Sequence, residues 1–235
     1  MPEFFDHSLP SNVTLVFGRP GSGKTTFCYR LIVNALTAQA ANVEPAACVF
    51  IYDWKQEAEK RLGVPAVTTV AGCEAALPSR LVVFNPHPMF PGTSLIRPPE
   101  GGEKVLNDYR HGVRWFCEWV FATCKSGPGR KIVYLDELKE FQSVFSLPHE
   151  IGRLARLGRA CGCQLLTSTQ FPRDYHKDLR GSVTEWVCFS CTEPVELDAV
   201  RPYFSGVDVA AGLTKGEFVA FNRDSGVKVR GKLFD

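Results

Sequence analysis

Short, nearly continuous apolar runs recur along the chain, separated by longer stretches in which apolar residues return at helical spacing. The short runs predict buried strands, and they cover residues 13–17, 48–52, 81–85, 132–135, 163–169 and 185–191. The longer stretches predict helices, at residues 25–40, 103–125 and 148–160.

The order of these elements indicates the class of fold. Strands that alternate with helices favour a mainly parallel sheet covered by helices on both faces. Near the C-terminus, strand-like runs at 218–222 and 227–232 flank Asp224, Ser225 and Gly226, which is typical of a β-hairpin. We therefore expect an α/β fold whose parallel sheet gains a C-terminal antiparallel hairpin.

Composition places the chain among ordinary globular proteins, with 45% apolar and 22% charged residues. No apolar run approaches the roughly 20 residues that cross a bilayer, so no intrinsic membrane segment is expected. We expect one domain over residues 1–235, with an N-terminal tail at 1–12 and a Pro- and Gly-rich loop at 86–102. Nine cysteines without an export signal indicate reduced, mostly buried thiols in a cytosolic protein.

The most specific motif follows the first predicted strand. Residues 18–25 fit the phosphate-loop pattern G-x-x-x-x-G-K-[ST]. Its glycines let backbone N–H groups wrap around an anion, Lys24 adds charge for the β- and γ-phosphates, and the Thr25 hydroxyl would ligate Mg²⁺. The nucleotide-binding residues expected here are Gly18, Arg19, Pro20, Gly21, Ser22, Gly23, Lys24, Thr25 and Thr26.

Two carboxylates end a later strand, where Asp136 and Glu137 follow the apolar run at 132–135. Asp136 would hold Mg²⁺, directly or through water. Glu137 would be the general base that activates the attacking water. Many strands end in acidic residues, so this interpretation depends on the phosphate loop that precedes it.

Polar residues also follow two other strands, and these should reach the same edge of the sheet. Asp53 and Lys55 come after the run at 48–52, and Gln170 comes after the run at 163–169. Because ligands bind beyond the carboxyl ends of parallel strands, Gln170 could contact the γ-phosphate or the attacking water. For Asp53 and Lys55, a salt bridge is as good an interpretation as a role in the site.

Basic residues are concentrated in one part of a chain whose net charge is only +2. Residues 153–180 contain six basic and two acidic side chains, a local charge of +4. Arg153, Arg156 and Arg159 recur every three residues, which rotates the row by about 120° along a helix. They cannot all reach one phosphate: one could be an arginine finger, while the others pair with acids or DNA or form a solvated face.

Four segments together resemble the FtsK–HerA superfamily of DNA-pumping ATPases. They are residues 18–25, 53–55, 136–137 and 159–172, and the last is similar to a family segment of an arginine, small residues, a strand and Thr-Gln-x-Pro. The resemblance spans residues 13–190, most of the chain. In its small size, the chain also resembles the genome-packaging ATPases of membrane-containing icosahedral viruses.

This resemblance implies a RecA-like P-loop NTPase core that uses ATP and Mg²⁺. It also implies a homo-oligomeric ring, commonly of six subunits, around double-stranded DNA. Arg159 matches the family's arginine finger, which acts on the neighbouring subunit's nucleotide, and Gln170 matches its sensor. The expected catalytic residues are Lys24, Glu137, Arg159 and Gln170. Phe171 stands where cellular members commonly carry arginine, so the role of that arginine is not carried over.

The sequence thus predicts an Mg-ATP-dependent DNA translocase that packages a viral genome in the host cytoplasm or the virion, with capsid or portal-vertex proteins as further partners. One alternative is a DNA-pumping or coupling ATPase of conjugation or secretion. Another is a nucleotide or small-molecule kinase, which should act on a discrete acceptor as a monomer or dimer. The third is a silent nucleotide-binding scaffold, against which Lys24, Asp136 and Glu137 argue.

Overall fold

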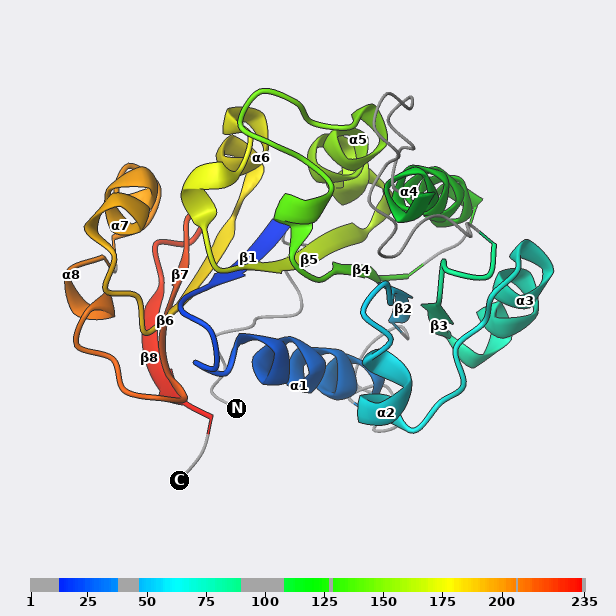
Figure 1. Cartoon of the computed structure of the whole chain (residues 1–235), viewed down its shortest axis with the longest axis horizontal. Coiled ribbons are helices and arrows are strands. Elements are labelled where there is room, and N and C mark those ends of the chain that lie inside the picture. Colours follow the sequence, from blue (N-terminus) through cyan, green and yellow to red (C-terminus); the bar gives the residue numbers. More distant parts are fainter. Residues whose placement is uncertain (1–12, 38–46, 90–107, 127–128, 206, 234–235) are drawn as a thin grey trace, which may run out of the picture.

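The computed structural model describes residues 13–37, 47–89, 108–126, 129–205 and 207–233. An eight-stranded sheet runs through the molecule in the order β3-β2-β4-β5-β1-β6-β7-β8 (Figure 1). The parallel strands are β1 (Val13–Phe17), β2 (Cys48–Tyr52), β3 (Leu81–Phe84), β4 (Lys131–Leu135), β5 (Cys163–Thr169) and β6 (Glu185–Phe189). Strands β7 (Glu217–Asn222) and β8 (Lys228–Lys232) add an antiparallel hairpin beside β6. The predicted α/β class is confirmed.

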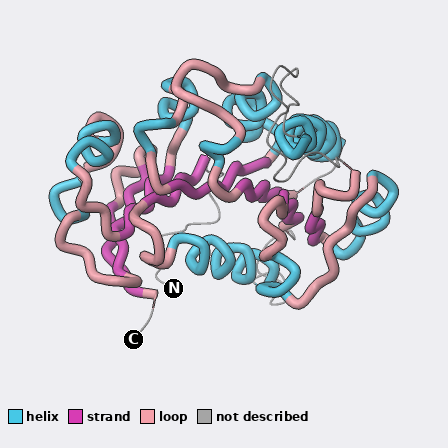
Figure 2. Tube along the Cα trace, in the orientation of Figure 1, coloured by secondary structure: helices cyan, strands magenta, loops and turns pink. Residues whose placement is uncertain are grey.

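Helices cover both faces of the sheet (Figure 2). On one face lie α1 (Lys24–Thr37) and α2 (Ala58–Leu62), and on the other lie α4 (Asp108–Ser126), α5 (His149–Leu157) and α6 (Lys177–Ser182). Helix α3 (Val70–Ala76) lies beside β3, whereas α7 (Pro194–Val200) and α8 (Val207–Ala210) lie near the hairpin. No helix in the described ranges is long and apolar enough to span a membrane.

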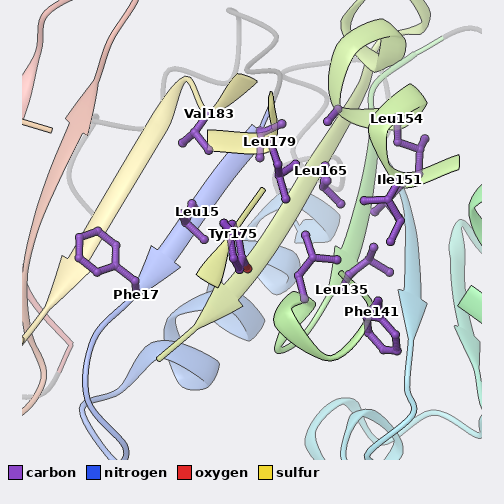
Figure 3. Packing of buried hydrophobic residues seen from close by; sticks show 14 of the residues in the cluster. Leu15, Phe17, Leu135, Phe141, Ile151, Leu154, Leu165, Tyr175, Leu179 and Val183 are labelled. Carbon is purple, nitrogen blue, oxygen red and sulfur yellow. The ribbon is translucent and has the colours of Figure 1, made fainter. Parts of the chain in front are cut away.

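Alternate side chains of each central strand enter two separate cores. Leu15 and Phe17 of β1 face the α4–α6 side, where Figure 3 shows them in one cluster with Leu135 and Leu165. Val16 faces the opposite side and belongs to the core built on α1. A strand buried on both faces favours apolar residues at most positions. This preference explains why β1 and β2 begin and end where the apolar runs do, whereas β5 also buries the polar residues Gln164, Thr167, Ser168 and Thr169.

Some predicted bounds differ from the structure. The helix predicted at 148–160 is shorter, because α5 ends at Leu157 and continues as a 3-10 turn, Gly158–Cys161. The strand predicted at 185–191 ends at Phe189, after which the Ser190 carbonyl accepts a hydrogen bond from the Arg19 N–H at 2.9 Å. Parts of the predicted helices, at 38–40 and 103–107, the tail at 1–12 and most of the loop at 86–102 lie outside the described residues.

Candidate nucleotide site

The order of the strands brings the predicted motifs together at one edge of the sheet. Strand β5 lies between β1 and β4, and the register pairs Phe17 with Thr169 and Leu135 with Thr167. The phosphate loop, Gln170 and the acidic pair therefore follow three adjacent parallel strands at their carboxyl ends. This is the edge at which open parallel sheets bind ligands.

The phosphate loop requires glycine at two positions. Gly18 has a φ of +145°, and a Cβ atom there would lie 2.9 Å from the Cβ of Phe189. Gly23 has a φ of +117°, and its Cβ would lie 2.9 Å from Cδ1 of Leu233. The Gly216 N–H also donates to the Ser22 carbonyl at 3.0 Å. Close packing against β6 and the C-terminal hairpin therefore sets the shape of the loop.

Lys24 is held inside this loop with only 6% of its surface exposed. Its ammonium donates hydrogen bonds to the carbonyls of Gly18, at 2.8 Å, and Arg19, at 3.0 Å. Burial lowers the pKa of Lys24, and attraction to Glu137 and Asp136 partly opposes this shift. The first turn of α1 contains no acidic residue, so the positive end of the helix is not neutralised locally. Both features favour a bound anion.

An open pocket of about 310 Å³ lies along the loop, where Gly21, Gly23, Lys24, Thr25 and Thr26 line it. Two cationic residues that the sequence analysis missed, Arg61 and Lys215, complete the lining. The cradle is thus basic and lined by glycine and hydroxyl groups, as a polyphosphate requires.

Asp53 explains how Arg61 reaches this pocket. Its carboxylate accepts hydrogen bonds from the backbone N–H groups of Glu57, at 2.9 Å, and Ala58, at 3.0 Å. These contacts fix the first turn of α2, the helix that carries Arg61. Asp53 therefore positions a helix in this structure.

Asp136 is 9% exposed, and both of its carboxylate oxygens are engaged. Its Oδ2 lies 2.8 Å from Nζ of Lys55, which is the salt bridge considered from the sequence. Its Oδ1 accepts hydrogen bonds from the hydroxyl groups of Tyr134, at 3.1 Å, and Ser168. Mg²⁺ prefers hard oxygen ligands, which the carboxylate and the Thr25 hydroxyl provide. The residues at this edge therefore fit the ion.

Glu137 adopts a backbone conformation that side chains other than glycine rarely take, with φ 49° and ψ 53°. A residue held there stores about 1–3 kcal/mol of strain. Gln170 donates from Nε2 to Oε1 of Glu137 at 3.1 Å, whereas the buried Oε2 has no hydrogen-bond partner in the described part of the chain. One oxygen is thus fixed and the other remains able to accept a proton, as a general base requires.

Arg159 is the one predicted catalytic residue that the fold does not bring to this edge. It lies in the 3-10 turn that precedes β5, at the opposite edge, and its guanidinium is 3.1 Å from Oδ2 of Asp224. Arg153 pairs with Glu118 at 3.0 Å. Arg159 could therefore act only on another subunit's nucleotide, as the resemblance implies.

The fold and the phosphate loop define a RecA-like P-loop nucleotide-binding protein, and solved structures agree. No protein-family model and no curated protein matches the chain. The genome-packaging NTPase B204 of Sulfolobus turreted icosahedral virus 2, in complex with AMP, is similar with a TM-score of 0.66 at 16% identity. The match covers 96% of this chain and 99% of that one.

Two further solved structures share the fold. VirB4 of Thermoanaerobacter pseudethanolicus has a TM-score of 0.62 at 9% identity, covering 94% of this chain and 88% of that one. The conjugation coupling protein TcpA of pCW3, with ATPγS, has a TM-score of 0.54 at 18% identity, covering 98% and 62%. The predicted RecA-like core is therefore confirmed as the fold of this chain.

The ion pair between Lys55 and Asp136 should contribute measurably to stability. We expect Lys55→Met to lower the free energy of unfolding by about 1–3 kcal/mol, because it removes the partner of a buried carboxylate oxygen. Chemical denaturation of the variant and of Lys60→Met, which changes an exposed lysine on α2, measures the effect. Equal stability of the two variants would mean that Asp136 does not depend on Lys55.

Proposed function

We propose that this protein is an Mg-ATP-dependent translocase of double-stranded DNA that packages a viral genome. The observation that carries this proposal is the meeting of Lys24, Asp136, Glu137 and Gln170 at one sheet edge. Similarity of nearly the whole chain to a genome-packaging NTPase supports the choice of cargo. The protein would work as a homo-oligomeric ring, with six subunits favoured, in the host cytoplasm or the virion, beside capsid or portal-vertex proteins.

In the proposed reaction, the backbone N–H groups of residues 18–25 and the Lys24 ammonium bind the β- and γ-phosphates of ATP. Lys24 exchanges its two carbonyl partners for phosphate oxygens, which makes charge-assisted hydrogen bonds. Thr25 and Asp136 hold Mg²⁺, which neutralises phosphate charge when bound.

Hydrolysis then depends on the carboxylate of Glu137. Its free Oε2 accepts a proton from the attacking water while Gln170 keeps Oε1 in place. Gln170 lies between the phosphate loop and Glu137 and would respond to loss of the γ-phosphate. Arg159 of a neighbouring subunit supplies positive charge in the transition state, after it leaves Asp224.

A second candidate is a DNA-pumping or coupling ATPase of conjugation or secretion. Similarity to VirB4 and TcpA supports it. It has the same phosphate chemistry and differs in the partner, because such an enzyme works with a membrane-bound assembly.

We expect ATP hydrolysis to rise more steeply than linearly with protein concentration, because the finger comes from another subunit. Long random-sequence double-stranded DNA should stimulate it, and added salt should weaken the stimulation, because contacts to phosphates release counterions. The measurement is ATPase activity at increasing protein concentration, with and without DNA, at low and moderate salt. Activity that is linear, indifferent to DNA and indifferent to salt would contradict the proposal and favour a kinase.

A further inference from the structure

A second pocket, of about 350 Å³, lies between the start of α4 and the segment that follows β4. Helix α4 leads into β4, so its first turns lie at the same sheet edge as the nucleotide site. The lining residues are Arg110, His111, Arg114, Glu140, Phe141, Gln142, Ser143, Ser146 and Pro148. We call this cavity the α4 basic pocket.

Within the described residues, acidic side chains do not neutralise the positive charge of the α4 basic pocket. Arg110 and Arg114 are four residues apart, hence on one face of α4, and both are exposed. Neither side chain makes an ion pair or hydrogen bond within the ranges that the structure describes. Glu140 supplies one negative charge to the lining, so the pocket remains net positive.

The basic stretch 153–180, in contrast to the α4 basic pocket, has several of its arginines paired with acidic residues. Arg153 and Arg159 are paired with acidic residues, and Arg173 lies 2.9 Å from the buried carboxylate of Glu196. Ion pairs therefore neutralise much of the positive charge that the sequence places there. Arg110 and Arg114, in contrast, form no ion pair within the described ranges.

An exposed aromatic side chain lies in the tight turn that forms one wall of the α4 basic pocket. Ser143 and Ser146 exchange backbone hydrogen bonds, at 2.8 and 3.3 Å, which leaves Val144 and Phe145 at the tip. Phe145 is 95% exposed, far more than any other large apolar residue of the described chain. Because Ser143 and Ser146 at the base of this turn line the pocket together with Arg110 and Arg114, this surface suits a polymer that is charged along its backbone and apolar between its charges.

This turn is tied to the catalytic segments. Gln142 accepts a hydrogen bond from the His176 N–H at 2.8 Å and donates to the Asp174 carbonyl at 3.3 Å. Gln142 lies five residues after Glu137, and His176 lies six residues after Gln170. Gln142 also lines the α4 basic pocket. A ligand bound there would thus contact the residue that links the segment after Glu137 to the segment after Gln170.

We propose that the α4 basic pocket binds backbone phosphates of double-stranded DNA through Arg110 and Arg114, with Phe145 against the adjoining deoxyribose. This inference rests on the proposed function and assigns it a contact surface. Because the contacts go to the backbone, the pocket grips DNA without regard to sequence.

The test compares DNA binding by the full-length wild-type protein with binding by Arg110→Gln/Arg114→Gln. Fluorescence anisotropy with a random-sequence duplex is recorded over a range of salt concentrations. Each lost phosphate contact should reduce the steepness of log affinity against log salt by about 0.9. A protomer that loses the contacts of both arginines should therefore show a slope that is shallower by about 2. We expect affinity at low salt to fall at least tenfold and the affinity for a fluorescent ATP analogue to stay the same.

A matched control removes the same charge elsewhere. Arg223→Gln/Lys232→Gln changes two exposed residues near and in β8 that make no ion pair in the described part of the chain. Its DNA affinity should change much less. A third variant, Phe145→Ala, should weaken DNA binding without altering the salt slope, and the exposure of Phe145 makes a folding defect unexpected.

Three outcomes would count against the inference. Equal losses of DNA affinity in the two double variants would reveal a general charge effect. An unchanged DNA affinity in Arg110→Gln/Arg114→Gln would exclude the α4 basic pocket as the contact surface. Weaker ATP binding in that variant would make the pocket part of the nucleotide site. Each of these leaves DNA translocation intact as a function. If the wild-type protein itself neither binds duplex DNA nor responds to it, the proposed function fails first.

Discussion

Glu137→Gln should bind Mg-ATP with nearly the wild-type affinity and hydrolyse it about 10²–10⁴-fold more slowly, the usual contribution of a general base. The amide preserves the size of the side chain, and its carbonyl oxygen can still accept the hydrogen bond from Gln170. The atom at the position of Oε2 then becomes an NH₂ group, which cannot take a proton from water. Fluorescent-nucleotide binding and single-turnover hydrolysis measure the two properties separately.

Two further variants serve as controls for Glu137→Gln. Glu74→Gln makes the same chemical change at an exposed position on α3 that lines neither pocket, and should leave basal hydrolysis unchanged. Lys24→Ala should abolish productive nucleotide binding, because it removes the ammonium from the phosphate cradle. If Glu137→Gln also lost nucleotide binding, Glu137 would have a structural role and Asp136 alone would define the acidic part of the site.

Arg159→Ala should reduce hydrolysis in the assembled protein by about 10³–10⁵-fold, the range for an arginine finger in related phosphoryl transfer. The affinity for ATP should change little, because Arg159 lies at the sheet edge opposite the phosphate loop of its own subunit. In one subunit it is half-exposed and paired with Asp224, an ion pair weak enough to exchange.

Mixing Arg159→Ala subunits with Lys24→Ala subunits tests whether the finger acts between subunits. Some interfaces in mixed assemblies combine an intact phosphate loop with an intact arginine, so activity should recover partly. Co-assembly is checked first by size-exclusion chromatography with distinguishable tags. Absence of recovery in assemblies that do mix would mean that the finger acts within one subunit or is another arginine, with Arg156 the next choice.

The sheet was predictable because its strands are buried on both faces. Every residue of β1 is buried, and its mainly apolar run coincides with the strand. The short helices were not predicted, because four to seven residues carry too little periodicity. Side-chain contacts define them instead, as where the Thr69 hydroxyl accepts from the Gly72 N–H at the start of α3.

Some residues of the candidate site were likewise predictable from the sequence, and others were not. Lys24, Asp136, Glu137 and Gln170 follow directly after strands, so parallel strand order alone brings them together. Arg61 and Lys215 reach the pocket through tertiary contacts. The first depends on Asp53 fixing α2, and the second on the hydrogen bond between Gly216 and Ser22. Local sequence carries no signal for either.

The two ends of the sheet limit how copies of this chain can join. At one end, Val67 forms a parallel bridge to Phe84 and covers part of β3. At the other, β8 exposes the alternate residues Lys228, Arg230 and Lys232, and charged edge strands resist pairing with another strand. A continuous sheet between subunits is therefore disfavoured. Subunits that meet through loops and helices instead can tilt against one another during a cycle, without breaking a shared ladder of backbone hydrogen bonds.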